Sequence, residues 1–254
     1  MTARTLYEAN GHRFILLEGF GHGEMVPTNQ VLIHDGDEGI LLDPGGHKVH
    51  YDLMDTIAGL MPINQLKYLF FSHQDPDIVA AVNAWLMLSD ADAYISELWL
   101  RFVPHFGVDE LMVSRLKGIP DAGMRLPLGN GELVFVPAHF LHSCGNFQVY
   151  DPQSKILFSG DMGANLVASD DLYRPYKKLK DAIPHMEAFH RRYMNSRKVC
   201  RYWANMVREL DVEWLVPQHG RPFKGRKVVR EFLDWISDLD CGIDLMTQAD
   251  YQIP

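Results

Sequence analysis

The amino-acid sequence predicts an α/β (α+β) domain in which two mixed sheets pack together and helices cover their outer faces. Short apolar strands dominate two blocks of the chain, and helical segments follow each block, as in a layered domain. The 254 residues suit one large domain, and no linker rich in glycine, proline or serine divides them. A content of 47% hydrophobic and 22% charged residues is typical of a globular chain with a sizeable core.

The first block contains short runs of branched and aromatic residues bounded by turn residues, which is the pattern of strands. These expected strands are Arg13–Leu17, Asn29–His34, Gly39–Asp43, Leu66–Phe71 and Ala93–Ser96. Apolar residues at helical spacing predict helices at Tyr51–Met61, Ile78–Leu88 and Leu111–Leu116. Strands therefore alternate with helices in this half.

The second block repeats this arrangement with a different sequence. Its expected strands are Leu133–Val136, Phe147–Asp151, Lys155–Phe158 and Trp214–Pro217. The chain from Tyr173 to Leu210 is predicted to be helical with a break near Pro184, and Lys227–Leu239 has the pattern of an amphipathic helix. Each sheet is therefore expected to have helices of its own.

Charge and cysteine content exclude several classes of protein. A formal net charge of −9 repels phosphate backbones, so no nucleic-acid partner is expected. The apolar runs are too short to span a bilayer, and the N-terminus lacks the apolar segment of a signal peptide, so no membrane contact is expected. The wide spacing of Cys144, Cys200 and Cys241 is typical of a protein in the reducing cytoplasm.

The segment after Leu66–Phe71 supplies three metal-binding side chains within five residues, namely His73, Asp75 and Asp77. On a helix the middle one would point away from the other two, so all three converge only from a loop. Pro76 favours such a loop because it disfavours helical backbone at the residue before it. The alternative is that Asp75 caps the following helix and Asp77 is a first-turn acid favoured by the helix dipole.

Three other strands end in the same way. His142 follows one apolar strand, Asp161 follows Lys155–Phe158 after a small-residue turn, and His219 follows Trp214–Pro217. A single histidine in such a place is most often an ordinary surface or core residue. Four matched strand ends are hard to explain without a metal site shared at one edge of the sheets.

The run HQDPD at 73–77 and the later strand ends resemble the metallo-β-lactamase superfamily over almost the whole chain. Its zinc hydrolases carry H-x-H-x-D-H. Here a carboxylate replaces the second histidine, as in the H-x-E-x-D run of flavodiiron proteins, and GNFQVYDPQSKILFSGD and VPQHG fit the later part of that signature. The chain is most similar to stand-alone oxygen-binding diiron proteins. The resemblance implies a four-layer αββα metallo-β-lactamase fold in a single domain, 1–254, without a flavodoxin-like domain.

The resemblance also implies two iron ions with a bridging oxo or hydroxo group and no flavin. The implied first-iron ligands are His73, Asp75 and His142, the implied second-iron ligands are Asp77 and His219, and Asp161 is the implied bridge. His139 competes with His142, which the spacing to Asp161 and the HSCGN turn favour. Independently of the family, three imidazoles and three carboxylates suit iron or manganese better than zinc.

Other positions have supporting roles in this interpretation. Ile78 stands where the superfamily run carries a further ligand, which implies an open position on the second iron for an external ligand. His22 lies in a glycine-rich loop and is a candidate pocket residue, with an exposed turn histidine as the alternative. Asp43 is expected to orient ligands by hydrogen bonding, and His139 and Glu97 are candidates for places beside the ligands.

The function that the resemblance implies is binding of dioxygen as a diferric-peroxo species, in a sensor of oxygen and iron. The first alternative is an oxygen or nitric oxide reductase that uses an external electron donor. The others are a metal-dependent hydrolase of phosphodiesters or thioesters and a binding module that has lost its metal. The expected partners are dioxygen, nitric oxide, a signalling protein or external reductant, and a second copy in a homodimer.

Overall fold

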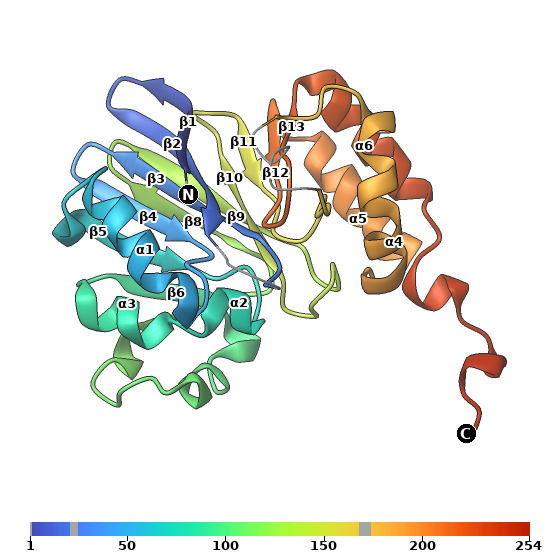
Figure 1. Cartoon of the computed structure of the whole chain (residues 1–254), viewed down its shortest axis with the longest axis horizontal. Coiled ribbons are helices and arrows are strands. Elements are labelled where there is room, and N and C mark those ends of the chain that lie inside the picture. The colour runs from blue at the N-terminus through green and yellow to red at the C-terminus, as the bar shows by residue number, and fades with distance from the viewer. Residues whose placement is uncertain (1, 21–24, 168–173) are drawn as a thin grey trace.

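The computed structural model describes residues 2–20, 25–167 and 174–254, which form two sheets packed face to face between two groups of helices (Figure 1). The first sheet has the order β1-β2-β3-β4-β5-β6-β7. Its strands are β1 (Thr2–Ala9), β2 (His12–Phe20), β3 (Thr28–Asp35), β4 (Glu38–Leu42), β5 (Leu66–Phe70), β6 (Asp92–Ser96) and β7 (Leu116–Ile119). Pairing is antiparallel from β1 to β4 and parallel from β4 to β7.

The second sheet has the order β13-β12-β11-β10-β9-β8. Its strands are β8 (Met124–Leu128), β9 (Gly131–Pro137), β10 (Phe147–Asp151), β11 (Ile156–Phe158), β12 (Trp214–Val216) and β13 (Phe223–Lys224). Only β11 and β12 pair in parallel. Parallel pairs need a crossover on one face of the sheet, so the chain between these two strands supplies helices there.

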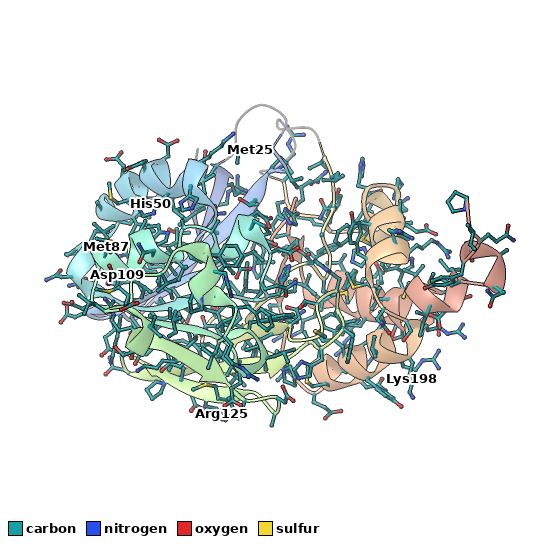
Figure 2. The ribbon with its side chains drawn as sticks, turned by 90° about the horizontal axis from the view of Figure 1, so that it is seen from below. Met25, His50, Met87, Asp109, Arg125 and Lys198 are labelled. Carbon is teal, nitrogen blue, oxygen red and sulfur yellow. The ribbon has the colours of Figure 1, made fainter. Side chains whose placement is uncertain are left out.

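Helices lie on the outer face of each sheet, as the two views show (Figures 1 and 2). The first group is α1 (His47–Ala58), α2 (Pro76–Val79) and α3 (Val82–Leu88), and the second is α4 (Ile183–Tyr193), α5 (Arg197–Arg208) and α6 (Arg226–Asp238). Pro184 lies in the first turn of α4, where its missing N–H costs nothing. Within the described ranges, every helix is too short or too polar to cross a membrane.

Strand β2 shows how one sheet contacts two layers. Phe14 and Leu16 belong to the apolar cluster between the sheets, whereas Ile15 and Leu17 belong to the cluster under α1 and α3. Successive side chains of a strand point to opposite faces, so a strand buried on both faces is apolar throughout. A third cluster fills the space between the second sheet and α4, α5 and α6. The predicted fold of two packed sheets between helices is therefore confirmed.

The helix predicted at Leu111–Leu116 is wrong. The chain there forms the short 3-10 helix η4 (Val113–Arg115) and then enters β7, and Leu111 is 80% exposed. The Arg115 guanidinium donates to the carbonyl oxygens of Leu86 and Ser89, and these bonds hold the segment against α3. Tertiary contacts of this kind override a local apolar periodicity.

Four strands, β1, β7, β8 and β13, are not visible in the sequence pattern, and each lies at the edge of its sheet. Strands β1 and β8 lie at the edges of their sheets, and their exposed faces carry polar residues such as Arg4 and Arg125. Strand β13 has two residues. The predicted helix Ile78–Leu88 is divided into α2 and α3, with Ala80 and Ala81 between them.

Candidate metal centre

Strand β5 and helix α2 position the first group of polar side chains. Asp75 has extended backbone and occupies the N-cap of α2, but its side chain makes no capping hydrogen bond. Its Oδ2 instead lies 3.5 Å from Nε2 of His73 and 3.6 Å from Nε2 of His142. Asp77 lies in the first turn of α2, as the helix-cap alternative predicts, but the contacts of Asp75 are those of the convergent group and not of a helix cap.

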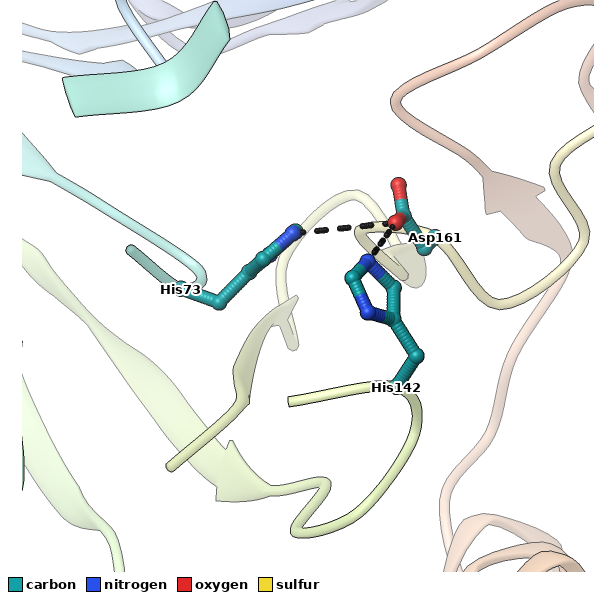
Figure 3. A group of neighbouring side chains, drawn as sticks. All are labelled: His73, His142 and Asp161. Atoms are coloured by element: carbon teal, nitrogen blue, oxygen red, sulfur yellow. Dashed lines mark ion pairs between the residues drawn. The ribbon is translucent and has the colours of Figure 1, made fainter. Parts of the chain in front are cut away.

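Asp161 lies at the centre of the candidate site. It follows β11 through Ser159 and Gly160, whose φ of 52° favours glycine. Its Oδ2 lies 2.6 Å from Nε2 of His142 and 3.6 Å from Nε2 of His73, as Figure 3 shows. These three side chains offer nitrogen and oxygen atoms within 4.8 Å of one another.

The other oxygen of Asp161 faces a second group. Its Oδ1 lies 3.4 Å from Nε2 of His219, which in turn lies 3.6 Å from Oδ2 of Asp77. Nδ1 of His219 lies 2.9 Å from the carbonyl oxygen of Pro27, so when Nδ1 carries the proton, Nε2 presents its lone pair to the carboxylates. The other five side chains predicted from the strand ends therefore gather around the buried carboxylate of Asp161.

Burial and charge act together on this group. Burial disfavours ionisation of Asp161, but the hydrogen bond with His142 and the charges of His73 and His219 hold the pKa of this carboxyl well below its usual range. Burial also opposes protonation of His73, yet the hydrogen bond with Asp75 and the charges of Asp161 and Asp75 raise the pKa of His73 to about 9. The carboxylates at this site therefore favour positive charge beside them.

The donor set fits two metal ions. Oδ1 of Asp161 is buried and accepts no hydrogen bond from the described part of the chain. An anionic oxygen left without a donor in the interior is costly unless a cation contacts it. Three imidazole and three carboxylate donors, arranged as two groups that share Asp161, could hold one ion on each side. That these residues bind iron stays a prediction.

Asp43 supports the site through Ser72. It is fully buried, and its two oxygens accept hydrogen bonds from the main-chain N–H and the hydroxyl of Ser72, both at 2.7 Å. Because that hydroxyl gives its only proton to Asp43, it accepts one from Nδ1 of His73, 3.0 Å away. Burial raises the pKa of Asp43 to about 7, against the hydrogen bonds from Ser72. Asp43 thus acts on His73 through an intermediate serine.

Two glutamines that the sequence interpretation missed hold the carboxylates. Gln74 donates from Nε2 to Oδ1 of Asp75 at 3.1 Å, and its Oε1 accepts a hydrogen bond from Ser143 at 2.6 Å. Gln218, which is fully buried, donates to Oδ2 of Asp77 at 3.3 Å. Each glutamine lies next to a predicted ligand in the sequence, and that adjacency was the only available signal.

The other predicted residues lie elsewhere. Nε2 of His139 lies 2.8 Å from the carbonyl oxygen of Asp121, and its ring packs against Phe147. Glu97 is exposed at the start of the 3-10 helix η2 (Glu97–Trp99). His22 lies outside the described residues. The side chain of Ile78 is fully buried in the cluster under the first sheet.

A cavity of about 670 Å³ opens over the candidate centre. Phe189 and Tyr193 of α4 form part of its wall, with their rings stacked at 4.7 Å, and the Tyr193 ring lies 5.7 Å from that of His142. The floor consists of five of the six predicted ligands, and the remaining wall is largely apolar: Met25, Val26, Ala164, Leu166 and Ala188. A small apolar molecule therefore has access to the carboxylates.

Comparisons with protein families and solved structures agree with this geometry. The model of the ODP family beta lactamase matches residues 26–220. A structure described as the peroxy diiron species of the chemotaxis sensor ODP is 39% identical, covers 96% of this chain and 98% of that chain, and has a TM-score of 0.86. The apo state of the chemotaxis sensor ODP from T. denticola is also 39% identical, with 96% and 97% covered and a TM-score of 0.83.

More distant relatives are longer proteins. Rubredoxin oxygen:oxidoreductase from Desulfovibrio gigas is 16% identical with a TM-score of 0.79, covers 93% of this chain and 61% of that chain, and is alike in fold. Diflavin flavoprotein A 1 of Synechocystis sp. is 30% identical over 156 residues, which are 61% of this chain and 26% of that protein. An uncharacterized protein of Methanocaldococcus jannaschii is 23% identical over 220 residues, 85% and 55% respectively. The chain thus spans about a quarter to about half of these curated relatives.

Proposed function

Because the chain belongs to the ODP family of beta lactamases, we propose that it binds dioxygen at a centre of two iron ions. The observation that carries the proposal is the position of Asp161, whose two oxygens face two separate groups of donors. The relative described as a peroxy diiron species, which is 39% identical over 96% of this chain, supports iron as the metal and dioxygen as the ligand.

The proposed centre uses all six strand-end residues. His73, Asp75 and His142 would hold one iron, Asp77 and His219 would hold the other, and Asp161 would be shared by both, in a centre that needs no flavin. The three carboxylates offset most of the charge of two divalent ions, which makes oxidation of those ions to the ferric state easier. A pair of ferrous ions supplies the two electrons that reduction of dioxygen to the peroxide level requires.

The protein positions the ligands and controls the surroundings. The Asp43–Ser72 pair holds the imidazole of His73, the carbonyl of Pro27 faces Nδ1 of His219, and Gln74 and Gln218 hold the carboxylates. The largely apolar wall formed by Phe189, Tyr193 and neighbouring side chains admits dioxygen and limits the number of water molecules at the carboxylates.

We further propose that the chain acts as a sensor of oxygen and iron that reports to a signalling protein. The description of its relatives as a chemotaxis sensor supports this role. The proposed location is the cytoplasm, which suits a chain whose three cysteines are free. Sensing, the signalling partner and a homodimer are proposals that require binding measurements.

Anaerobic reconstitution with ferrous ion, followed by exposure to oxygen, tests the function. A stable visible charge-transfer band at about two irons per chain, absent from the Asp161→Asn variant, is the expected result. Rapid formation of a featureless ferric spectrum contradicts stable oxygen binding. Continuous oxygen or nitric oxide consumption with an added reductant favours the reductase alternative, and zinc with phosphodiesterase activity favours the hydrolase.

A further inference from the structure

Two cysteines meet in the core far from the candidate metal centre. Cys200 of α5 and Cys241, which follows α6, are both fully buried, and their Sγ atoms lie 3.8 Å apart. They are 41 residues apart in the sequence. Cys144 is an exposed free thiol in the turn after His142 and has no such partner among the described cysteines.

We propose that Cys200 and Cys241 are an oxidisable dithiol, which a hydroperoxide converts into a disulfide between α5 and the C-terminal segment (residues 241–254). A disulfide has an S–S distance of about 2.05 Å, so the sulfurs must approach by about 1.8 Å to form the bond. The proposal concerns a site separate from the proposed iron centre and does not depend on it.

The surroundings make the two sulfurs unequal. The hydrogen bond with Cys200 lowers the pKa of Cys241. Burial and the neighbouring Asp244 and Asp240 raise this pKa, and the charge of Arg191 lowers it. The same hydrogen bond, together with burial, raises the pKa of the Cys200 thiol. Either sulfur can be the donor in this hydrogen bond, so either thiol can react first; with Cys241 as the nucleophile, Cys200 is the thiol that resolves the product.

The oxidation balances in two steps. The Cys241 thiolate attacks one oxygen of the hydroperoxide, the O–O bond breaks, and the departing alkoxide or hydroxide takes a proton to give an alcohol or water. The Cys200 sulfur then attacks the sulfenic acid on Cys241, the S–O bond breaks, and the departing hydroxide takes the Cys200 proton to give water. Overall, two thiols lose two electrons and two protons, and one hydroperoxide is reduced.

The disulfide would hold the first residue of the C-terminal segment, residues 241–254, in place against α5. Cys241 is the N-cap of the 3-10 helix η7 (Gly242–Leu245), beyond which the chain extends away from the two sheets (Figure 1). The segment is attached to the body by the bond from the Ile243 N–H to the carbonyl of Asn195 and by Asp244, whose carboxylate accepts from the Arg197 N–H. A cavity of about 810 Å³ between α4 and this segment is lined by Gly242, the neighbour of Cys241 in the sequence.

The same cavity relates the segment to the candidate metal centre. Tyr193, whose ring packs against His142, lines both this cavity and the one over the carboxylates. A disulfide at Cys241 would therefore restrict the motion of the segment beside Tyr193, the side chain that the two cavities share.

Hydrogen peroxide treatment of the reduced full-length chain tests the proposal. After denaturation and alkylation, thiols per chain are expected to fall from three to one, with an intact mass loss of about 2 Da and a peptide that links Cys200 to Cys241. The Cys144→Ser variant should form the same link, and Cys200→Ser should form none. Hydrogen exchange of residues 242–254 should slow in the oxidised protein, as expected for a segment tethered at its start.

Two results would overturn the proposal. One is retention of three thiols under conditions that oxidise a reference dithiol peptide, and the other is oxidation confined to Cys144. The Asp161→Asn variant separates this site from the proposed iron centre, because it should keep the peroxide-induced disulfide whether or not the chain binds iron.

Discussion

Replacing Ser72 by alanine should weaken the first metal position without a comparable loss of fold stability. The change removes the hydroxyl that donates to Asp43 at 2.7 Å and that lies 3.0 Å from Nδ1 of His73. Asp43 keeps its main-chain bond from residue 72, so the loop retains one of its two anchors. The His73 ring, however, loses the contact that fixes its orientation.

The size of the effect follows from the burial of these groups. Ser72 and Asp43 are fully buried and His73 is 1% exposed, so water cannot replace the lost hydroxyl without rearrangement. Loss of a partner that orients a metal ligand typically weakens metal binding by about 10- to 100-fold, or about 1.4 to 2.7 kcal/mol. We expect a change of this size for one of the two ferrous ions and a smaller change for the other.

Anaerobic calorimetric titration with ferrous ion measures both affinities. Ser89→Ala is the matched control, because Ser89 is also buried, but its hydroxyl donates to the carbonyl of Trp85 at the end of α3, away from the predicted ligands. Equal affinity losses in the two variants, or unchanged binding in Ser72→Ala, would refute the assignment of an orienting role to Ser72. Thermal unfolding of both variants shows whether either has lost its fold.

Other changes test separate contacts. Asp161→Asn should reduce bound iron from about two per chain to less than one, as metal analysis would reveal, because both groups of donors share this carboxylate. Gln218→Ala should weaken only the ion beside Asp77, by about fivefold, since it removes one buried hydrogen bond, and equal weakening of both ions would count against it. At the end of the sheets opposite the candidate site, burial opposes the charged form of His12, but the hydrogen bond with Asp151 raises the pKa of His12. This contact therefore stabilises the fold below about pH 6.5, and the stabilisation decreases as the pH rises through the raised pKa. Asp151→Asn should therefore lower the unfolding temperature more at pH 6 than at pH 9, and a uniform decrease would contradict the linkage.

The strands that carry the candidate site could be predicted because their pattern is local. Runs such as Leu66–Phe71 are apolar on both faces apart from the exposed Lys67, and they end abruptly in polar residues. Edge strands such as β1 carry alternating exposed positions and look like loops. The segment at 111–116 was misread because the contacts of Arg115 with the chain around α3 depend on a fold that periodicity does not encode.

The candidate site divides in the same way. The six strand-end residues could be named because the family motif and the chemistry of His and Asp mark them. Ser72, Gln74 and Gln218 could not, since a hydroxyl or an amide beside a motif has no function until another segment lies within hydrogen-bond distance. The bond from Gln218 to Asp77 joins residues 141 positions apart, a contact that only the packing of the two sheets creates.

The six side chains are divided between two bodies. His73, Asp75 and Asp77 follow β5 of one sheet, whereas His142, Asp161 and His219 belong to loops of the other. A cation bound here would therefore link the two sheets, and its binding free energy would stabilise their packing against each other. A change in the distance between such a cation and its ligands would therefore act on the contact between the two sheets. Closely packed rings such as Phe70 and Phe135 would transmit the displacement.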